Sequence, residues 1–201
     1  MSLKSDIEAL CKEIVEDYSD WKYVAGQFKN DNLKHTQRVF DPRWTFRAGE
    51  AKLLTRTMLC NKNIISLSNK IFGQKPNFTS VVIHSRYVEN YVRPSAIYSL
   101  DDGSAEKRIR YEMDICMQIL NEHYPYDESI DEITLLKKLP EKSMGLEGIE
   151  YCLVRAYLDD FGYVSDYCFN VNGKGNRRNR HLKRIDEIIK YYDLKQVKTS
   201  L

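Results

Sequence analysis

Residues 98–120 decide the fold class, and they read YSLDDGSAEKRIRYEMDICMQIL. The turn sequence Asp101-Asp102-Gly103 inside them separates two kinds of periodicity. After the turn, apolar side chains recur at helical spacing on one face, at Ile109, Met113, Cys116 and Leu120. Before the turn, β-branched and aromatic residues are frequent, and residues 79–87 alternate as in a strand, with Val81, Ile83, Ser85 and Tyr87 on one side. We therefore expect strands before residue 101 and helices after it.

The first hundred residues begin with a helix and continue with strands. Ser5-Asp6-Ile7-Glu8 has the spacing of a capping box, and the helix that it starts is expected to end near Ser19-Asp20. Strands are predicted at 21–28, at 33–40 with Asp41-Pro42 ending the strand, at 44–46, at 53–60 and at 96–100. The pattern of 53–60 also fits a helix. A short helix is predicted from Asn63, and Gly73 is expected to end it in the left-handed conformation.

Helices dominate the second hundred residues. Ser129-Ile130-Asp131-Glu132 is a second capping box, and Pro140 closes the helix that follows it. Two more helical stripes are formed by Leu146, Ile149, Leu153 and Tyr157, and by Leu182, Ile185, Ile188, Ile189 and Tyr192. Because strands and helices segregate, the sequence predicts an α+β fold, with a helix and an antiparallel sheet in residues 1–100 and a helical region in residues 101–201. We expect the helical region to pack on or beside the sheet in one compact domain.

Length and composition exclude some classes of protein. The 201 residues can bury a core that needs neither a metal nor disulfides. The longest aliphatic run is Val81-Val82-Ile83, whereas a membrane span needs roughly 20 apolar residues, so we expect no membrane helix. The cysteines are odd in number and contain no C-x-x-C pair; they are Cys11, Cys60, Cys116, Cys152 and Cys168. This pattern is typical of reduced thiols in a cytoplasmic protein.

Charge is distributed unevenly although the formal net charge is only +2. Lys and Arg minus Asp and Glu give +5 for residues 1–100, −9 for residues 101–170 and +6 for residues 171–201. Such a succession has two interpretations. The acidic and basic segments dock on one another, or the basic surfaces stay free for an anionic partner.

The strongest compositional anomaly is the basic segment at residues 172–184, NGKGNRRNRHLKR. It places positive charge at the start of a predicted helix, where the helix dipole is already positive, so stability alone does not explain it. Its backbone N–H groups and cations predict contact with a phosphate or another anion. The candidate residues are Lys174, Arg177, Arg178, Arg180, Lys183 and Arg184. The competing interpretation is a solvated loop whose arginines pair with the acidic segment.

A second candidate site is Asp41 with Glu50-Ala51-Lys52. The order of helix, strands, Asp, Glu-x-Lys and helix is similar to the core of PD-(D/E)xK nucleases, which implies that Asp41 and Glu50 hold Mg²⁺ and that Lys52 stabilises charge at the attacked phosphate. The acid-x-Lys pattern also occurs at Asp20-Trp21-Lys22 and at Asp193-Leu194-Lys195. Moreover, Asp41-Pro42 has the reverse order of the Pro-Asp of that family. The alternative interpretation is a turn Asp and a solvated Glu/Lys pair.

Other patterns are less specific. The four histidines are isolated, no Cys lies at zinc-site spacing, and no local nucleophile signature is present, so no metal or catalytic His is predicted. The mixture of cations and aromatic rings around Trp44 and Phe46 suits single-stranded nucleic acid, but it also describes the wet and buried faces of one sheet. Of 14 Tyr residues, 11 lie at or beyond Tyr91, which is typical of an interface and suggests self-association.

No family resemblance is strong enough to transfer a function, so two hypotheses of different classes follow from the residues. The first is a non-enzymatic, cytoplasmic binding protein without a cofactor, whose partner is another protein or a second copy, with an anion contact at residues 174–184. Nucleic acid is a further candidate partner, and a membrane is not expected. The second is a Mg²⁺-dependent phosphodiesterase that uses Asp41, Glu50 and Lys52. The distance between the first two carboxylates distinguishes the hypotheses.

Overall fold

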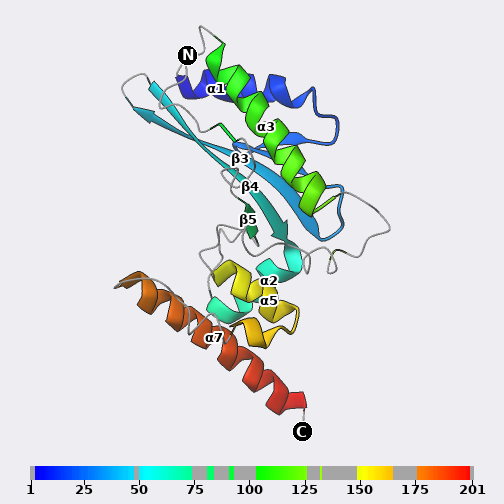
Figure 1. The fold of residues 1–201 in the computed structure, drawn as a ribbon, viewed down its shortest axis with the longest axis vertical. Helices are drawn as coiled ribbons and strands as arrows, with labels where there is room; N and C mark the ends of the chain where they lie inside the picture. The colour runs from blue at the N-terminus through cyan, green and yellow to red at the C-terminus, as the bar shows by residue number, and fades with distance from the viewer. Residues whose placement is uncertain are drawn as a thin grey trace. The chain divides into compact units, whose positions relative to one another are not determined.

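The computed structural model of the chain describes residues 3–47, 50–73, 81–83, 91–92, 103–125, 132, 149–164 and 176–199. Its helices are α1 (Leu3–Val15), α2 (Lys62–Phe72), α3 (Ser104–His123), α5 (Ile149–Tyr157) and α7 (Asn176–Thr199). Its strands are β1 (Lys22–Val24), β2 (Gln27–Asn30), β3 (Thr36–Arg47), β4 (Glu50–Asn61) and β5 (Val81–Ile83). Figure 1 shows this order of elements, which confirms the predicted α+β class. Most of the expected strands at 79–87 and 96–100, and of the expected helix after Ser129, lies outside the described residues.

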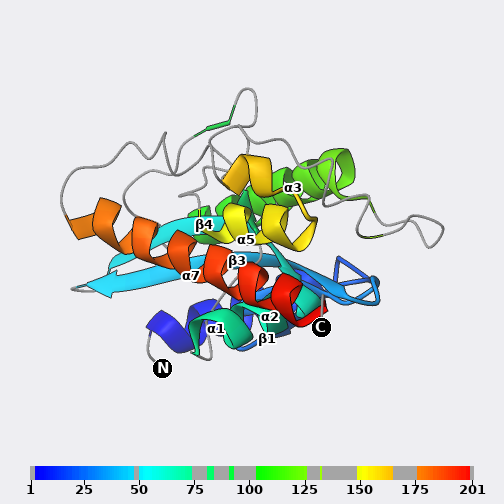
Figure 2. The ribbon, with the colours of Figure 1, turned by 90° about the horizontal axis from the view of Figure 1, so that it is seen from below.

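The chain divides into two compact units that interleave along the sequence and do not follow a boundary at residue 100. The sheet unit comprises Met1–Leu59 and Val82–Gly145, and the helical unit comprises Cys60–Val81 and Leu146–Leu201. In the helical unit, α2 packs against α5 and α7, and α5 packs against α7 (Figure 2). A helix from the first half of the chain therefore shares a core with helices from its end.

The sheet of the sheet unit has the strand order β1-β2-β3-β4-β5. β1 pairs with β2 and β2 with β3 in antiparallel register, in which Tyr23 faces Phe28 and Phe28 faces Phe40. β3 and β4 are also neighbours, and the Thr45 hydroxyl donates a 3.5 Å hydrogen bond to the Lys52 carbonyl. Side chains alternate between the two faces of a strand. One face, called here the inner face, carries Phe28, Phe40, Trp44, Leu53, Thr55 and Thr57; the outer face carries Gln27, Asp41, Arg43, Lys52, Leu54 and Arg56.

Two helices cover the inner face. Leu10 of α1 and Trp44 of β3 pack against the buried pair of Leu53 and Ala105, which come from β4 and α3. The predicted stripe of α3 is fully buried at Ile109, Met113, Cys116 and Leu120. The helices also touch each other beyond the end of α1, where the Tyr18 hydroxyl donates to Asp114 Oδ1 at 3.3 Å. The core of the sheet unit therefore lies between the inner face and the pair α1 and α3.

The expectation of one strand at 21–28 was wrong, because β1 and β2 form a hairpin there. Ala25 and Gly26 have positive φ angles of 53° and 79°. Two consecutive residues with positive φ make the turn whose twist suits a two-residue hairpin. Gly adopts this conformation without strain, but Ala rarely does, and the sequence Ala-Gly is a weak turn signal. The alternation continued across the turn and concealed it.

The expectation that Asp41-Pro42 ends a strand was also wrong, because β3 continues to Arg47. β2 pairs with β3 at Phe40, Val39 and Arg38, so Pro42 lies beyond the paired residues. Pro is tolerated in a strand where its missing N–H leaves no hydrogen bond to a neighbouring strand unmade. The ambiguous segment 53–60 belongs to β4 and is a strand.

Caps delimit the first helix of the helical unit, which begins at Lys62, one residue before the predicted start, and ends at the predicted Gly73. The Asn61 side chain accepts hydrogen bonds from the backbone N–H groups of Asn63 and Ile64, at 3.0 and 3.2 Å. Gly73 ends α2 in the left-handed conformation, with φ 64°. Ile185 and Ile188 of the predicted α7 stripe are fully buried. Within the described part of the chain, no helix combines the length and apolarity needed to cross a lipid bilayer.

Candidate functional site

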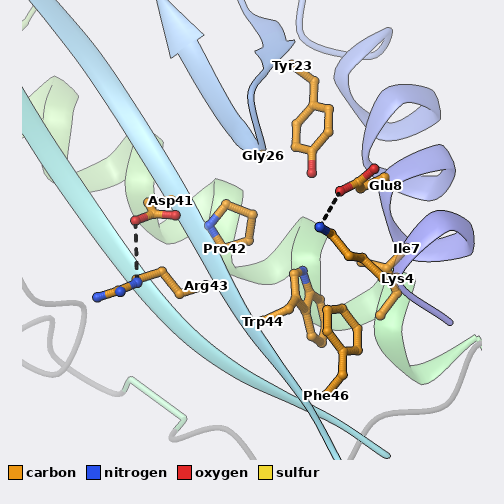
Figure 3. Close-up of a pocket in the computed structure, with 10 residues that line it drawn as sticks. All are labelled: Lys4, Ile7, Glu8, Tyr23, Gly26, Asp41, Pro42, Arg43, Trp44 and Phe46. Atoms are coloured by element: carbon orange, nitrogen blue, oxygen red, sulfur yellow. Dashed lines mark ion pairs between the residues drawn. The ribbon is translucent and has the colours of Figure 1, made fainter. Parts of the chain in front are cut away.

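A pocket of about 210 Å³ lies in the sheet unit between the first turns of α1 and β3. Its apolar and aromatic walls are Ile7 of α1, Tyr23 and Gly26 of the β1–β2 hairpin, and Pro42, Trp44 and Phe46 of β3. Figure 3 shows the Trp44 and Phe46 rings on the side of β3 that faces α1. Alternation along β3 explains this, because Pro42, Trp44 and Phe46 are every second residue. The pocket forms beside the β1–β2 hairpin, where β3 continues past the residues that pair with β2.

Charged side chains surround the apolar walls. Lys4 Nζ lies 3.8 Å from Glu8 Oε1, and Arg43 Nε lies 4.0 Å from Asp41 Oδ2 (Figure 3). The first pair is well exposed and stabilises the fold little. Asp41 is different, since its side chain is only 16% exposed. Burial raises the pKa of Asp41, although Arg43, Arg56 and a hydrogen bond from Gln27 each lower it.

Tyr23 gives the pocket a polar tip that is hard to ionise. Its ring meets Phe28 edge to face with centroids 5.0 Å apart, and in Figure 3 its hydroxyl points toward Glu8. Burial, the neighbouring Cys11 thiol and Glu8 raise the pKa of Tyr23. Burial likewise raises the pKa of Cys11 to about 11. These groups are neutral near pH 7, so the walls around Tyr23 supply a hydrogen-bonding hydroxyl and no nucleophile.

The three residues of the expected magnesium site occupy the β3–β4 ribbon, defined here as strands β3 and β4. Asp41 lines the pocket, Lys52 is exposed, and the backbone of Glu50 begins β4. Along β3, Asp41 lies six residues before the end of the strand at Arg47, and β4 begins at Glu50. The Glu50 side chain lies outside the described residues, so the magnesium site stays a prediction.

The described residues contain no cluster of metal ligands. There, no group of three or more His, Cys, Asp or Glu side chains is arranged to hold a metal ion. Free thiols occur at Cys11, Cys60, Cys116 and Cys152, three of them buried, as expected of core cysteines. Burial raises the pKa of Cys116 to about 12, against smaller opposing effects of Thr57 and Arg38. Cys168 lies outside the described residues.

The basic segment predicted to bind an anion begins α7. Arg177, Arg178 and Arg180 fall in the first turns of this helix, which starts at Asn176, and Lys174 lies outside the described residues. Lys183 is exposed. The Arg184 guanidinium lies 4.8 Å from the ring centroid of Phe72 in α2, so it makes a cation–π contact inside the helical unit.

A buried ionic cluster lies between α3 and β4 and contains none of the predicted site residues. Glu112, whose side chain is fully buried, accepts hydrogen bonds from Arg108, from the Tyr91 hydroxyl at 2.7 Å and from the Thr55 hydroxyl at 2.8 Å. Arg108 also donates to the Val92 carbonyl at 2.7 Å, and its guanidinium lies 4.8 Å from the Tyr111 ring centroid. Burial and Glu112 raise the pKa of Tyr91 to about 12. Each group has a structural task, namely to hold the 91–92 segment against α3 and β4.

Sequence reasoning missed the pocket and this cluster for different reasons. The sequence shows the aromatic pair Trp44 and Phe46. The pocket wall formed by α1 cannot be predicted from it, because α1 packs against β3 over a long sequence separation. Arg108 and Glu112 have the spacing of an ordinary exposed helical ion pair. The available signal was that Glu112 falls on the apolar stripe of α3 between Ile109 and Cys116.

Comparison with protein-family models, with curated proteins and with solved structures finds no match to this chain.

Proposed function

We propose that the chain is a non-enzymatic binding protein that recognises another protein, and that the α1–β3 pocket accepts one apolar side chain of that partner. The supporting observation is a small cavity with an apolar base and a charged rim. Ile7, Pro42 and Trp44 contribute to the base, and the pairs Lys4–Glu8 and Asp41–Arg43 form the rim. Protein–protein interfaces have the same organisation, with buried aromatic anchors inside a polar ring.

The volume of the pocket supports a side chain as its occupant. Pockets for small molecules and cofactors measure about 300–1,000 Å³. At about 210 Å³, the α1–β3 pocket is smaller than that range. Phe46 is 36% exposed at its mouth, so apolar surface is accessible before a partner arrives. An aromatic or aliphatic side chain would cover it without displacing the core.

Two further parts of the proposal come from the sequence. The start of α7, with Arg177, Arg178 and Arg180, is proposed to contact an anionic group of the partner, together with Lys174, Lys183 and Arg184. A cytoplasmic location is proposed because the described cysteines are free thiols. A second copy of the chain is one of the partners that the experiment below can identify.

Selection from a phage-displayed library of random peptides tests the pocket. Selected peptides are labelled with fluorescein, and their affinity is measured by anisotropy against the wild type and Phe46→Ala. We expect one apolar peptide residue to be essential, and we expect Phe46→Ala to weaken binding about tenfold or more. Because Phe46 is partly exposed, its truncation spares the core.

Leu54→Ala is the matched control, because Leu54 is 52% exposed and lies on the outer face, away from the pocket. It should leave peptide affinity unchanged. The proposal fails if the two variants weaken binding equally, if selected peptides lack an apolar anchor, or if selection yields no peptide that binds the folded protein.

The competing proposal is the phosphodiesterase with Asp41, Glu50, Lys52 and Mg²⁺. It predicts hydrolysis of bis(p-nitrophenyl) phosphate in the presence of Mg²⁺ or Mn²⁺ and loss of that activity in Asp41→Asn. The binding proposal predicts no hydrolysis in either protein. Metal-dependent turnover that Asp41→Asn abolishes would decide for the enzyme.

A further inference from the structure

The outer face of the β3–β4 ribbon carries a patch of cations, of which only Arg43 also lines the pocket. This patch, called here the ribbon patch, consists of Arg43, Lys52, Leu54 and Arg56, with Asp41 among them. Val39 and Met58 alternate onto the same face but are buried, at 1% and 3% exposure. The accessible part of the outer face therefore lies beyond them, toward the end of the ribbon.

Register brings the patch together from two strands. Thr45 contacts Lys52, so counting back along an antiparallel pair puts Arg43 opposite Leu54 and Asp41 opposite Arg56. The electrostatic effect of Arg56 on Asp41 agrees with this placement. Leu54 is 52% exposed, and the Arg43 side chain is also 52% exposed. Three cations thus surround one exposed apolar side chain and share one half-buried carboxylate.

Stability does not explain this arrangement. Arg38, on the inner face of the same strand, is buried and donates to Asn30 Oδ1 from Nε and Nη2 at 3.2 and 3.0 Å. Arg43 Nε lies 4.0 Å from Asp41 Oδ2, too long for a hydrogen bond. Arg43 lies diagonally across the ribbon from Lys52 and Arg56, and cations in this arrangement do not stabilise one another, although Arg56 lies opposite Asp41. A patch of this kind is favoured when an anionic partner neutralises it.

The shape and composition of the patch indicate which anionic partner fits. A two-stranded β-ribbon fits the major groove of duplex DNA, which is about 12 Å wide. Single-stranded nucleic acid is usually bound by aromatic rings that stack on its bases. None of the outer-face side chains described by the structure is aromatic. An acidic protein surface would need more apolar area than Leu54 supplies at the centre of the contact.

We propose that the ribbon patch binds the phosphate backbone of double-stranded DNA, with Arg43, Lys52 and Arg56 as phosphate contacts and Leu54 against the groove. The binding is independent of base sequence, because phosphates carry no sequence information. Three contacts give a shallow salt dependence, with a slope of log affinity against log salt of about −2.7. This site adjoins the proposed side-chain pocket at Arg43, which lines both, whereas Lys52 and Arg56 do not line the pocket and belong to the patch alone.

Fluorescence anisotropy with a fluorescein-labelled DNA duplex tests the proposal in the full-length chain at several salt concentrations. The variant is Lys52→Gln with Arg56→Gln, which removes two exposed or half-buried cations and leaves the pocket residues unchanged. We expect its affinity at low salt to fall about tenfold and its salt slope to decrease by about 2. Binding of the wild type should be in the range of about 10⁻⁴–10⁻⁶ M.

Lys12→Gln with Lys107→Gln is the matched control, because both lysines are exposed on helices and the net charge changes equally. It should keep at least half of the wild-type affinity. The proposal is overturned if the wild type does not bind duplex at low salt, or if the control loses as much affinity as the patch variant. It is also overturned if Arg177→Ala with Arg178→Ala and Arg180→Ala abolishes binding while the patch variant does not.

Competing anions complete the test. Single-stranded DNA of the same length, poly-glutamate and vesicles containing phosphatidylserine are added as competitors of the labelled duplex. Unlabelled duplex should compete best. Stronger competition by any of the other three would assign the patch to that ligand and refute duplex DNA. Loss of peptide binding in Phe46→Ala with intact DNA binding would separate this site from the proposed pocket.

Discussion

The two faces of the sheet in the sheet unit differ in how they bury and pair the same type of side chain. On the inner face, Arg38 is 3% exposed and hydrogen-bonded to Asn30. On the outer face, Arg43, five residues later on β3, is half exposed and keeps only a long contact with Asp41. Both positions follow from alternation along one strand. The difference is that α1 and α3 cover the inner face, whereas the outer face is exposed toward the end of the ribbon.

The comparison shows where polar groups stabilise this fold and where they are available for a ligand. On the inner face, Arg38 and Thr55 are removed from most water and have hydrogen-bond partners, so removing one partner is costly. Charges on the outer face remain solvated, and their mutual interactions are weak. Substitutions on the inner face should therefore lower the free energy of unfolding. Matched substitutions on the outer face should instead weaken ligand binding.

The largest effect is expected for Glu112→Ala. This change leaves Arg108, Tyr91 and Thr55 without their buried carboxylate, so the free energy of unfolding should fall by about 3–5 kcal/mol. Urea denaturation followed by circular dichroism measures the loss. Glu106→Ala is the control, since Glu106 forms a partly exposed pair with Arg110 on the same helix, at 2.9 Å, and should cost less than about 1 kcal/mol.

Glu112→Gln keeps the test decisive if Glu112→Ala fails to fold. Gln retains an oxygen acceptor but has no charge to pair with Arg108, so we expect an intermediate loss of stability. Equal stability of the Glu112 and Glu106 variants would mean that the buried cluster does not hold α3 on the sheet.

The next largest effect on the free energy of unfolding is expected from a comparison of two threonines, Thr55 and Thr45. The Thr55 hydroxyl donates to Glu112 Oε2 at 2.8 Å, whereas that of Thr45 reaches the Lys52 carbonyl at 3.5 Å in an exposed position. Thr55→Val should lower the free energy of unfolding by about 1.5–3 kcal/mol, because a hydrogen bond to a charged group is lost. Thr45→Val should change it by less than about 0.5 kcal/mol. A loss at Thr45 as large as at Thr55 would contradict the difference between the faces.

The ribbon patch should be neutral for stability. Lys52→Gln with Arg56→Gln should shift the free energy of unfolding by no more than about 0.5 kcal/mol, since surface substitutions usually fall within that range. The same urea experiment measures it. A clear destabilisation would mean that these cations hold the sheet together, and the loss of DNA affinity expected above would then need another explanation.

The sequence predicts the elements of this fold where local signals are strong. The stripe of Ile109, Met113 and Cys116 predicted α3, and Gly73 predicted the end of α2. These predictions hold because the burial of a helix face and the conformation of a glycine are local properties. The hairpin at Ala25-Gly26 was missed because an Ala with positive φ carries no clear signal.

The candidate site depends on contacts that local patterns do not contain. The pocket exists because β3 outlasts β2 and because the first turns of α1 lie beside the extra length. The sequence predicts that Pro42 ends a strand, which would put Trp44 and Phe46 on a separate strand. The length of β3, which the local pattern does not contain, joins these residues in one strand instead.

Asp41 is expected to give the smallest effect, and its sign can be worked out. Burial raises the pKa of Asp41 above the ordinary value of 3.8, so at pH 7 the charged side chain is less favourable in the folded than in the unfolded state. Asp41→Asn removes that penalty and should raise the urea midpoint at pH 7. As the pH falls through the raised pKa toward 3.8, the folded carboxyl becomes protonated and the penalty disappears, so the advantage of Asn should vanish. Arg43→Ala removes a cation that lowers this pKa, and it should shift the loss of the advantage to higher pH. An advantage that appears only at low pH would mean that the Asp41 charge stabilises the fold, as a paired carboxylate of the inner face does.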